Sequence, residues 1–358
     1  MVITFILPGI SPWKPVGGFK VVYEYANHLS KRGHRINVVH PLILLRGKIS
    51  IKKRVGIPLI LGLNYLFGLP KVSWFNISPK VNMLVVPSLE ERFIPNGDVI
   101  FATAWQTAEW VSKYNQNKGK KYYLIQHYEI WSGDEEKVRS TWKLPLKKIV
   151  ISKWLKDIAE EMGEKIAGYV PNGLDFNHFW IKNPIENRNP KRVGMLYSKT
   201  VWKGSEDGIK ALCLVRKQIP DLQGVFFGVS SRGKNVPRWV EYYQNPRPDK
   251  LLNIYNSCSI FVGSSWYEGW FLPGSEAMAC GCAVVSTDCG GIREYAEHGV
   301  NALLSPPKDP QALAQNILRL LEDDDLRVRL AKAGYERIQK FTWGKAVDEF
   351  EKVISDQK

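Results

Sequence analysis

The residues best suited to chemistry lie in one stretch, Tyr267-Glu268-Gly269-Trp270-Phe271-Leu272-Pro273-Gly274-Ser275-Glu276. Pro273 fits the first residue of a helix, because the N–H that proline lacks would have no partner there. A helix that starts at residues 272–273 presents backbone N–H groups that suit a diphosphate. Glu276 in its first turn can accept hydrogen bonds from two vicinal hydroxyls, as on a ribose. Glu268, in the loop before the helix, can face the other end of the same ligand.

Two glutamates near a helix start also have an ordinary interpretation. They cap the helix and offset its dipole, and each contributes only about 0.3–1 kcal/mol in that role. The residues that follow favour a ligand site instead. Residues 277–287 have the pattern of a helix and then a buried strand, and Gly290-Gly291 comes next. A glycine pair lets the backbone approach a ligand closely.

The run from Glu268 to Gly291 resembles the C-terminal domain signature of family 4 retaining glycosyltransferases. That signature is an EG-(F/Y)-G-(L/I)-P-x-x-E-A-M-A-x-G core followed by a V-V-x-x-x-x-G-G turn. The chain departs from it at Trp270, where the family usually has a small residue, and at Cys282, where proline is common. Trp270 bears on the shape of the sugar pocket. The likeness continues through residues 299–304, 310–321 and 341–343, so it covers the second half of the chain.

The resemblance implies which residues bind a nucleoside-diphosphate sugar, the donor. Lys203 aligns with a family lysine that contacts the diphosphate, and Lys199 is the candidate for the family arginine. A solvated surface charge is an equally open interpretation of Lys199. Cations directed at the departing diphosphate stabilise the charge that develops on it. The expected donor-binding residues are Gly17, Gly18, Lys199, Lys203, Glu268, Gly269, Trp270, Phe271, Leu272 and Glu276.

The first half of the chain resembles the same family more loosely. Gly17-Gly18 matches the glycine-rich loop over the donor phosphates. Gln126-His127-Tyr128-Glu129 follows an apolar run, where the family places polar residues near the reacting sugar. His127 joins Glu268 and Lys203 as a candidate catalytic residue, and a plain surface histidine is the alternative. Asn172-Gly173 is expected to line a cleft between two domains.

The apolar pattern predicts two domains. Residues 2–7, 19–32 and 35–39 form a strand–loop–helix–strand unit, which builds parallel sheet. A Pro- and Asn-containing break begins at Pro171, and the alternation of strands and helices then restarts. We therefore expect an α/β protein with two Rossmann-like, doubly wound domains. The family resemblance implies the GT-B architecture, in which the two domains face each other across a cleft. Residues 1–176 would bind the acceptor and residues 177–341 the donor, and the helix at 342–358 would pack back onto the first domain.

Further elements follow from the same patterns. Strands are expected at residues 82–86, 99–102, 122–125, 148–151, 193–197, 222–228, 258–263, 283–287 and 302–304. Helices are expected at residues 105–114, 153–162, 205–218, 249–256, 273–279, 292–297, 310–321 and 324–340.

Composition fits a folded protein of 358 residues, with 44% hydrophobic and 24% charged residues. The first residues have no basic segment before the apolar run, so they indicate a buried strand and not a secretory signal. No run of about 20 apolar residues predicts a transmembrane helix. The five cysteines lack zinc-ligand spacing, and a reducing cytoplasm fits them best.

The net charge of +15 is unevenly distributed. Residues 1–175 carry 25 Lys/Arg and 14 Asp/Glu, whereas residues 176–358 carry 25 and 21. The basic residues Arg46, Lys48, Lys52, Lys53 and Arg54 precede an uncharged run from 55 to 70. We expect segment 46–70 to contact an anionic membrane, which would make the protein cytoplasmic and peripheral on the inner face. A crossover helix packed on the sheet is the alternative for this segment, and we expect no nucleic-acid partner.

The predicted reaction moves a glycosyl group from a nucleoside-diphosphate sugar to a hydroxyl of a growing glycan, lipid-linked or on the cell surface, with retention of configuration. The sequence has no D-x-D motif in a fitting place, and lysines with a helix dipole can replace a cation. We therefore expect neither a metal nor another cofactor. Two alternatives remain: an epimerase or phosphorylase-like enzyme of the same fold, or a non-catalytic basic protein that binds membrane or nucleic acid. The donor base, the donor sugar and the linkage do not follow from the sequence.

Overall fold

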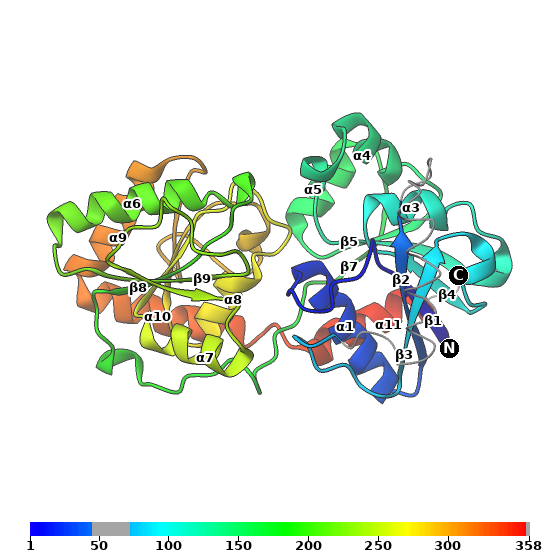
Figure 1. The fold of residues 1–358 in the computed structure, drawn as a ribbon, viewed down its shortest axis with the longest axis horizontal. Coiled ribbons are helices and arrows are strands. Elements are labelled where there is room, and N and C mark those ends of the chain that lie inside the picture. The colour runs from blue at the N-terminus through cyan, green and yellow to red at the C-terminus, as the bar shows by residue number, and fades with distance from the viewer. Residues whose placement is uncertain (45–71, 356–358) are drawn as a thin grey trace. The chain divides into compact units, whose positions relative to one another are not determined.

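The computed structural model describes residues 1–44 and 72–355, which form two compact units (Figure 1). The first unit comprises Met1–Pro171 and Trp343–Lys358, and the second comprises Asn172–Thr342. Segment 46–70, predicted to contact a membrane, lies outside the described residues. Of the helices in the described ranges, none is both long and apolar enough to cross a bilayer.

The first unit contains a seven-stranded parallel sheet of order β3-β2-β1-β4-β5-β6-β7. Central strands are buried on both faces, as continuous apolar runs such as Val99–Ala102 require. Its strands are β1 (Val2–Ile6), β2 (Arg35–Ile43), β3 (Val81–Ser88), β4 (Val99–Ala102), β5 (Lys120–Ile125), β6 (Lys147–Val150) and β7 (Ile166–Tyr169).

Helices cover both faces of this sheet, with α1 and α11 together on one face and α3, α4 and α5 on the other (Figure 1). Their bounds are α1 (Gly17–Lys31), α3 (Trp105–Val111), α4 (Glu135–Trp142), α5 (Lys153–Glu161) and α11 (Trp343–Ser355), with 3-10 turns at η1 (Glu91–Phe93), η2 (Gln116–Lys118) and η3 (Ile130–Ser132).

The last helix, α11, belongs to the first unit although the second unit precedes it in the chain. The Phe350 ring stacks on Tyr25 of α1, with centroids 4.5 Å apart, and on Phe101 of β4, at 4.9 Å. At the surface, Arg32 forms ion pairs with Asp348, at 2.6 Å, and with Glu351. Apolar burial therefore fixes α11 on this sheet, and exposed charges add a smaller contribution.

The second unit contains a six-stranded parallel sheet of order β10-β9-β8-β11-β12-β13. The strand order reverses between β8 and β11, which makes the carboxyl ends of these two strands the expected ligand position. The strands are β8 (Arg192–Leu196), β9 (Gln223–Gly228), β10 (Val240–Gln244), β11 (Ile260–Gly263), β12 (Ala283–Thr287) and β13 (Leu303–Ser305).

In this unit α6 and α9 pack together on one face, and α7 and α8 cover the other (Figure 1). The core between the sheet and α6 and α9 is wholly apolar, with Val215, Val262 and Ile317 completely buried. The helices are α6 (Ser205–Gln218), α7 (Pro248–Ser257), α8 (Leu272–Ala279), α9 (Pro310–Glu322) and α10 (Asp324–Ile338), with η4 (Ile185–Asn187), η5 (Val201–Lys203) and η6 (Gly291–Glu294).

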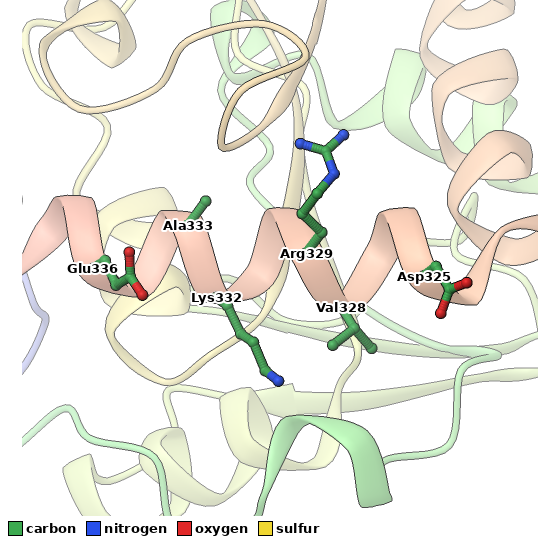
Figure 2. A pocket seen from close by; sticks show the side chains of 6 residues that line it. All are labelled: Asp325, Val328, Arg329, Lys332, Ala333 and Glu336. Atoms are coloured by element: carbon green, nitrogen blue, oxygen red, sulfur yellow. The ribbon is translucent and has the colours of Figure 1, made fainter.

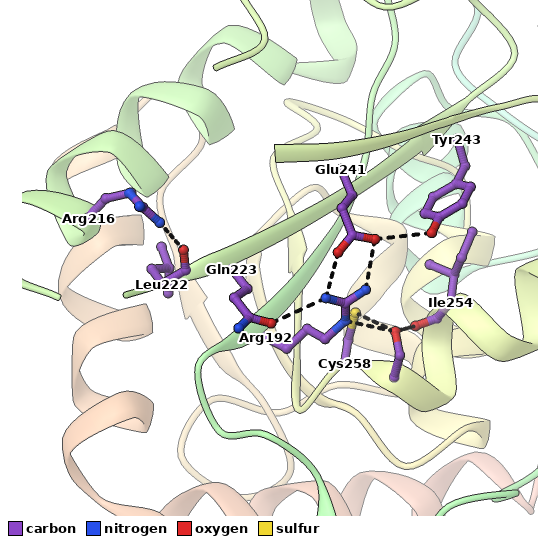
Figure 3. Close-up of polar contacts among 9 residues, drawn as sticks. Arg192, Arg216, Leu222, Gln223, Glu241, Tyr243, Ile254 and Cys258 are labelled. Atoms are coloured by element: carbon purple, nitrogen blue, oxygen red, sulfur yellow. Dashed lines mark hydrogen bonds and ion pairs between the residues drawn. The ribbon is translucent and has the colours of Figure 1, made fainter. Parts of the chain in front are cut away.

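Polar side chains connect β8, β9 and β10 near the amino-terminal ends of these strands (Figure 3). Arg192 binds both carboxylate oxygens of Glu241, at 2.8 and 3.0 Å, and its pairing holds the pKa of Glu241 below the ordinary value. Gln223 accepts a further hydrogen bond from Arg192, at 3.3 Å. These contacts stabilise the pairing of the three strands at the ends opposite to the predicted ligand position.

The predicted α/β architecture of parallel, doubly wound sheets is confirmed. Some local predictions are wrong. Gly17-Gly18 lies in the first turn of α1 and not in the preceding loop, and the helix predicted at 292–297 is the short 3-10 turn η6. The sequence did not predict α4, β7 or β10. Strand β7 has four residues and β10 has a largely exposed side, so neither produces a strong apolar pattern.

Candidate functional site

Two loops meet at the reversal point of the second sheet. One follows β8 and carries Lys199 and Lys203, and the other follows β11 and carries Glu268. Since β8 and β11 are hydrogen-bonded neighbours, residues 61 or more apart in the chain come into contact here. Lys203 and Glu268, two of the predicted donor-binding residues of the second half, are therefore brought together.

The central contact is an ion pair between Lys203 and Glu268. Lys203 Nζ lies 2.6 Å from Glu268 Oε1, and Ser265 Oγ donates to the same oxygen at 2.7 Å. The Glu268 side chain is 8% exposed and that of Lys203 is 29% exposed. The carboxylate is thus nearly buried and held by two donors, while the ammonium group still reaches solvent.

Close backbone contacts fix the Lys203 loop in place. Gly204 has φ +59°, and a Cβ at this position would lie 1.8 Å from the carbonyl oxygen of Ser264, so only glycine fits. Ser264 Oγ donates to the Lys203 carbonyl at 3.1 Å, and Trp266 N donates to the Trp202 carbonyl at 2.7 Å. The indole N–H of Trp266 donates to Asp207 at 2.8 Å. The two loops are therefore one hydrogen-bonded assembly.

The Gly290-Gly291 pair supports Glu268 from the other side. Glu268 N donates to the Cys289 carbonyl at 2.7 Å, and Gly291 N donates back to the Glu268 carbonyl at 2.9 Å. A Cβ on Gly291 would lie 2.2 Å from the Gly269 carbonyl oxygen. These glycines therefore allow a close approach to residues 268–269 of the chain itself, and they hold that segment in position.

Helix α8 begins with a strained residue. Phe271 has φ +61° and ψ +65°, a left-handed conformation that is unusual for a bulky side chain. Tyr295 Oη stabilises it by donating to the Phe271 carbonyl at 2.6 Å. No side chain caps the helix, and within the described part of the chain no acceptor contacts the backbone N–H of Phe271 or Leu272. These N–H groups are available to an anion.

The Trp270 side chain lies in an aromatic cluster. It is 4% exposed, and its ring centroid lies 5.5 Å from that of Tyr295 and 5.4 Å from that of Phe341. The large side chain, at a position where the family that the sequence resembles usually has a small residue, is therefore accommodated by packing inside the second unit. Gly269 and Trp270 contribute their backbone to the turn that leads into α8.

Glu276 is held by a residue of α7. Tyr255 Oη donates to Glu276 Oε2 at 2.9 Å, and both side chains are buried. Burial is the main reason that the pKa of Tyr255 is raised well above its ordinary value, so the phenol stays protonated and remains a donor. This contact fixes the carboxylate at the fifth residue of α8, so the prediction that Glu276 lies in the first turn of the helix is wrong by one residue.

Lys199 is separate from this cluster. Its Nζ contacts Ser231 Oγ at 3.0 Å, in the loop that follows β9. The structure therefore brings together Lys203, Glu268, Phe271, Leu272 and Glu276, whereas the Lys199 side chain contacts the loop that follows β9.

The first unit places its predicted residues at the carboxyl edge of its own sheet. Gly18, in the first turn of α1, lies beside the Gln126 side chain, which is 3.6 Å from the position of a Cβ on that glycine. The His127 ring, which follows β5, stands edge-on to Trp131 and Trp154, with centroids 6.1 Å away in both cases. Asn172-Gly173 is buried where the chain passes from the first unit to the second.

A surface hollow on α10 is lined by none of these residues, and a second hollow shares only Tyr295 with them. Figure 2 shows the first hollow, where six side chains project from α10: Asp325, Val328, Arg329, Lys332, Ala333 and Glu336. Lys332 is engaged with Glu186, at 2.5 Å. A neighbouring hollow shares Ala333 and Glu336. Both hollows are lined by acidic as well as basic side chains, and neither lining contains an arrangement like that of Lys203, Glu268 and Ser265.

Some residues of the site were not predicted. Ser265 and Tyr255 fix the two carboxylates, and Trp266 joins the two loops. Ser265 lies two residues before the Tyr267–Glu276 stretch, and its residue type alone indicates no role. Tyr255 lies 21 residues before Glu276, and no local pattern connects the two.

The fold matches solved structures over its whole length. Sucrose-phosphate synthase from Thermosynechococcus elongatus aligns with a TM-score of 0.73 and 17% identity, over 99% of this chain and 98% of that chain. HepE of Anabaena, solved in complex with UDP, aligns with a TM-score of 0.73 and 17% identity, over 100% of both chains. The chain has the GT-B fold, as predicted.

Residues 178–337 match the model of the glycosyl transferases group 1 family. These residues make up nearly all of the second unit, in which the Lys203–Glu268 pair lies. The second unit is therefore similar to the group 1 glycosyltransferases.

Curated relatives agree with this family over part of their length. An uncharacterized glycosyltransferase of Methanocaldococcus jannaschii is 28% identical over 212 residues, which are 58% of this chain and 59% of the relative. A D-inositol 3-phosphate glycosyltransferase of Corynebacterium jeikeium is 29% identical over 34% of this chain and 29% of its own length. An N-acetylgalactosaminyltransferase of Campylobacter jejuni is 37% identical over 25% of this chain and 24% of its own length.

Proposed function

We propose that this protein is a retaining glycosyltransferase, which transfers a sugar from a nucleoside diphosphate to a hydroxyl of a growing glycan. One observation carries the proposal: Lys203 and Glu268 form a 2.6 Å ion pair beside the open N-terminus of α8. The match of residues 178–337 to the group 1 glycosyl transferase family supports the class of reaction.

The chemistry requires a site for increasing negative charge. When the bond between the sugar and the diphosphate breaks, the leaving diphosphate gains charge. Lys203 has three N–H donors, of which Glu268 takes one, so two remain for phosphate oxygens. The N–H groups of Phe271 and Leu272 add dipoles that are already oriented. Because these groups need no rearrangement, they stabilise the leaving group as its charge appears.

The two glutamates bind the donor in this proposal. Glu276, held by Tyr255, accepts hydrogen bonds from the ribose hydroxyls, and Glu268 contacts the donor sugar or its phosphate. Neither is assigned as a nucleophile. Lys203 and the α8 N–H groups supply the positive charge that a metal would otherwise provide, so we extend the proposal to metal-independent transfer.

The acceptor is proposed to be a lipid-linked or cell-surface glycan, bound by the first unit. The Campylobacter jejuni relative is named as an enzyme that acts on a diphospho-undecaprenol-linked sugar, which supports an acceptor of this kind. Such an acceptor places the enzyme in the cytoplasm, peripheral on the inner face of the membrane. Segment 46–70 is the proposed contact with anionic lipid.

The experiment begins with a thermal-shift screen of UDP, GDP, dTDP and ADP, since a nucleotide that binds only the folded state raises the melting temperature. The sugar nucleotides of the base that binds are then tested for transfer, with and without EDTA. We expect Glu268→Ala and Glu276→Ala each to reduce turnover at least about tenfold, or roughly 1.4 kcal/mol of transition-state stabilisation.

Glu322→Ala, at the exposed end of α9, is the matched control and should keep the full rate. Turnover like that of the unchanged protein in both site variants contradicts the proposal. Conversion of a sugar nucleotide to its epimer without an acceptor would show an epimerase instead.

A further inference from the structure

The loop between β1 and α1 is fixed at three points and yet presents an indole to solvent. Trp13 in this loop is 70% exposed. Three carbonyls around it accept hydrogen bonds from β2 and from the segment before β3. The bonds run from His40 Nδ1 to Gly9 O (2.8 Å), from Trp74 Nε1 to Ser11 O (2.7 Å) and from Ser73 N to Pro12 O (2.8 Å). The exposure of Trp13 is therefore imposed by an ordered backbone.

A second exposed indole, Trp131, also lies on a fixed turn. It is 42% exposed and occupies the middle of η3, which follows β5. Trp105 donates from its backbone N to Glu129 Oε2, at 2.8 Å, and from its indole N to Ser132 Oγ, at 2.9 Å. Ser132 Oγ donates in turn to the Glu129 carbonyl, at 2.9 Å. Tryptophan is enriched at binding interfaces, where its ring is apolar and its N–H can still find a partner.

The two loops belong to the same edge of the sheet. Strands β1 and β5 are parallel and are separated only by β4, so their carboxyl ends lie roughly 10 Å apart. The contact between Gly18 and the Gln126 side chain joins the start of α1 to the segment that follows β5. This edge, where the strand order reverses between β1 and β4, is where doubly wound sheets bind ligands.

Gln126 has a hydrogen-bonding capacity that the described residues do not use. Its side-chain oxygen Oε1 is buried, and in residues 1–44 and 72–355 it has no hydrogen-bond donor. A buried acceptor without a donor destabilises the folded protein. A ligand that brings an O–H or N–H group to this edge would remove that destabilisation.

We propose that this edge of the first unit is a carbohydrate subsite, in which Trp13 and Trp131 hold sugar rings of the acceptor and Gln126 Oε1 accepts a hydrogen bond from a sugar hydroxyl. The subsite rests on the proposed function and defines how its acceptor is recognised. A pyranose ring has an apolar face of C–H groups and a rim of hydroxyls. An indole ring packs against the apolar face at little cost in side-chain entropy, and an amide oxygen accepts a hydrogen bond from a hydroxyl of the rim.

A lipid surface fits these residues less well. Exposed tryptophans also lie at membrane interfaces. An acyl chain, however, has no donor for Gln126 Oε1, and the neighbouring His127 adds another polar group beside Trp131. The polar groups together with the rings favour a sugar.

The test is saturation-transfer NMR on the full-length protein with a panel of methyl glycosides: the α and β forms of glucoside, galactoside, mannoside and N-acetylglucosaminide. We expect saturation of the C–H protons of at least one glycoside. Trp13→Ala, Trp131→Ala and Gln126→Ala should each reduce that signal roughly fivefold or more. Trp131→Phe, which keeps an aromatic face, should retain part of it.

Trp180→Ala is the matched control, because Trp180 is 45% exposed and lies in the second unit. It should leave the glycoside signal unchanged. If nucleotides raise the melting temperature but no glycoside binds, the subsite is wrong while the proposed function stands. If no nucleotide binds, the proposed function itself fails.

Two other results would overturn the subsite. One is a glycoside signal that none of the three variants changes. The other is that Trp13→Ala and Trp131→Ala weaken co-sedimentation with anionic phosphatidylglycerol vesicles and leave glycoside binding intact, which would assign the rings to a membrane.

Discussion

Each carboxylate of the candidate site is oriented by a neutral hydroxyl. Ser265 donates to Glu268, at 2.7 Å, and Tyr255 donates to Glu276, at 2.9 Å. These donors add no charge to a site that must attract a diphosphate, and they hold the carboxylates before a ligand arrives. Ordering that is already complete lowers the cost of binding.

Tyr255→Phe tests this positioning. The substitution keeps the ring, which packs on Phe261 with centroids 5.4 Å apart, and removes only the hydroxyl. Losing one hydrogen bond to a buried carboxylate should weaken nucleotide binding roughly tenfold, in line with about 1.5 kcal/mol for a bond to a charged group. Isothermal titration calorimetry with the nucleotide found by thermal shift measures the change.

Tyr114→Phe is the control, since Tyr114 is a buried phenol of the first unit that donates to the Leu89 carbonyl at 2.7 Å. Both variants should lose some thermal stability, and only Tyr255→Phe should lose nucleotide affinity. Equal affinity in the two variants would show that Glu276 does not depend on Tyr255.

At the scale of elements, two loops of the first unit depend on groups with pKa values shifted in opposite directions. His40, which holds the β1–α1 loop through Gly9, is buried, and burial lowers its pKa to about 4. Glu129, which holds the loop after β5 through Trp105, is also buried, and burial raises its pKa to about 7. Both shifts disfavour the charged form.

These shifts predict opposite pH dependences. His40 has an ordinary pKa of 6.5, so the unfolded chain binds its proton as the pH falls from 6.5 towards 4, and the stability that His40 contributes is lost in that window. Glu129 has an ordinary pKa of 4.5, so the unfolded chain loses its proton first and stability is lost as the pH rises from 4.5 towards 7. Between pH 5 and 7 each effect amounts to about 2 kcal/mol, and they oppose each other.

Urea unfolding at pH 5, 6 and 7 separates the two effects. Relative to the unchanged protein, His40→Gln should gain stability at low pH. The pH dependence of the unfolding free energy that remains in this variant is that of Glu129, which favours the folded state at low pH. Glu129→Gln should gain stability at neutral pH for the converse reason, and glutamine still accepts the Trp105 N–H. Parallel pH profiles in the two variants would contradict the assignment.

Elements with local signals were predictable from the sequence. The apolar runs at Val99–Ala102 and Ala283–Thr287 were predicted with the bounds that the structure gives, and so was Ser205–Gln218, which begins directly after Gly204. The start of α1 was missed because two glycines have weak helix propensity, and here Gly18 lies against the Gln126 side chain. Tertiary contact decides that boundary.

At the scale of the whole molecule, the site depends on pairings that spacing does not encode. The sequence indicated Glu268 by its place before a helix start, and the family resemblance indicated Lys203. Their 2.6 Å contact arises because the sheet order places β8 beside β11, across 65 residues of sequence. The rings of Trp13 and Trp131 share an edge for the same reason. Residue types were therefore predictable, and their partners required the fold.

The positive charge of the chain is concentrated in its first half, which favours binding to an anionic surface. Residues 1–175 account for most of the net charge of +15, and a group of five basic residues lies between 46 and 54. A basic residue near an anionic membrane contributes about 1 kcal/mol of binding, and salt screens that attraction. The first half of the chain should therefore bind anionic vesicles in a salt-dependent manner.

Neutralising Lys52, Lys53 and Arg54 to glutamine tests this expectation, because the three charges together should contribute more than tenfold to vesicle binding at about 0.1 M salt. Co-sedimentation with phosphatidylglycerol vesicles measures the loss, and vesicles of neutral phosphatidylcholine set the background. The control neutralises the exposed Lys210, Lys217 and Lys234 of the second unit, which removes the same net charge. Equal losses in the two triple variants would mean that total charge, and not segment 46–54, attracts the protein to the membrane.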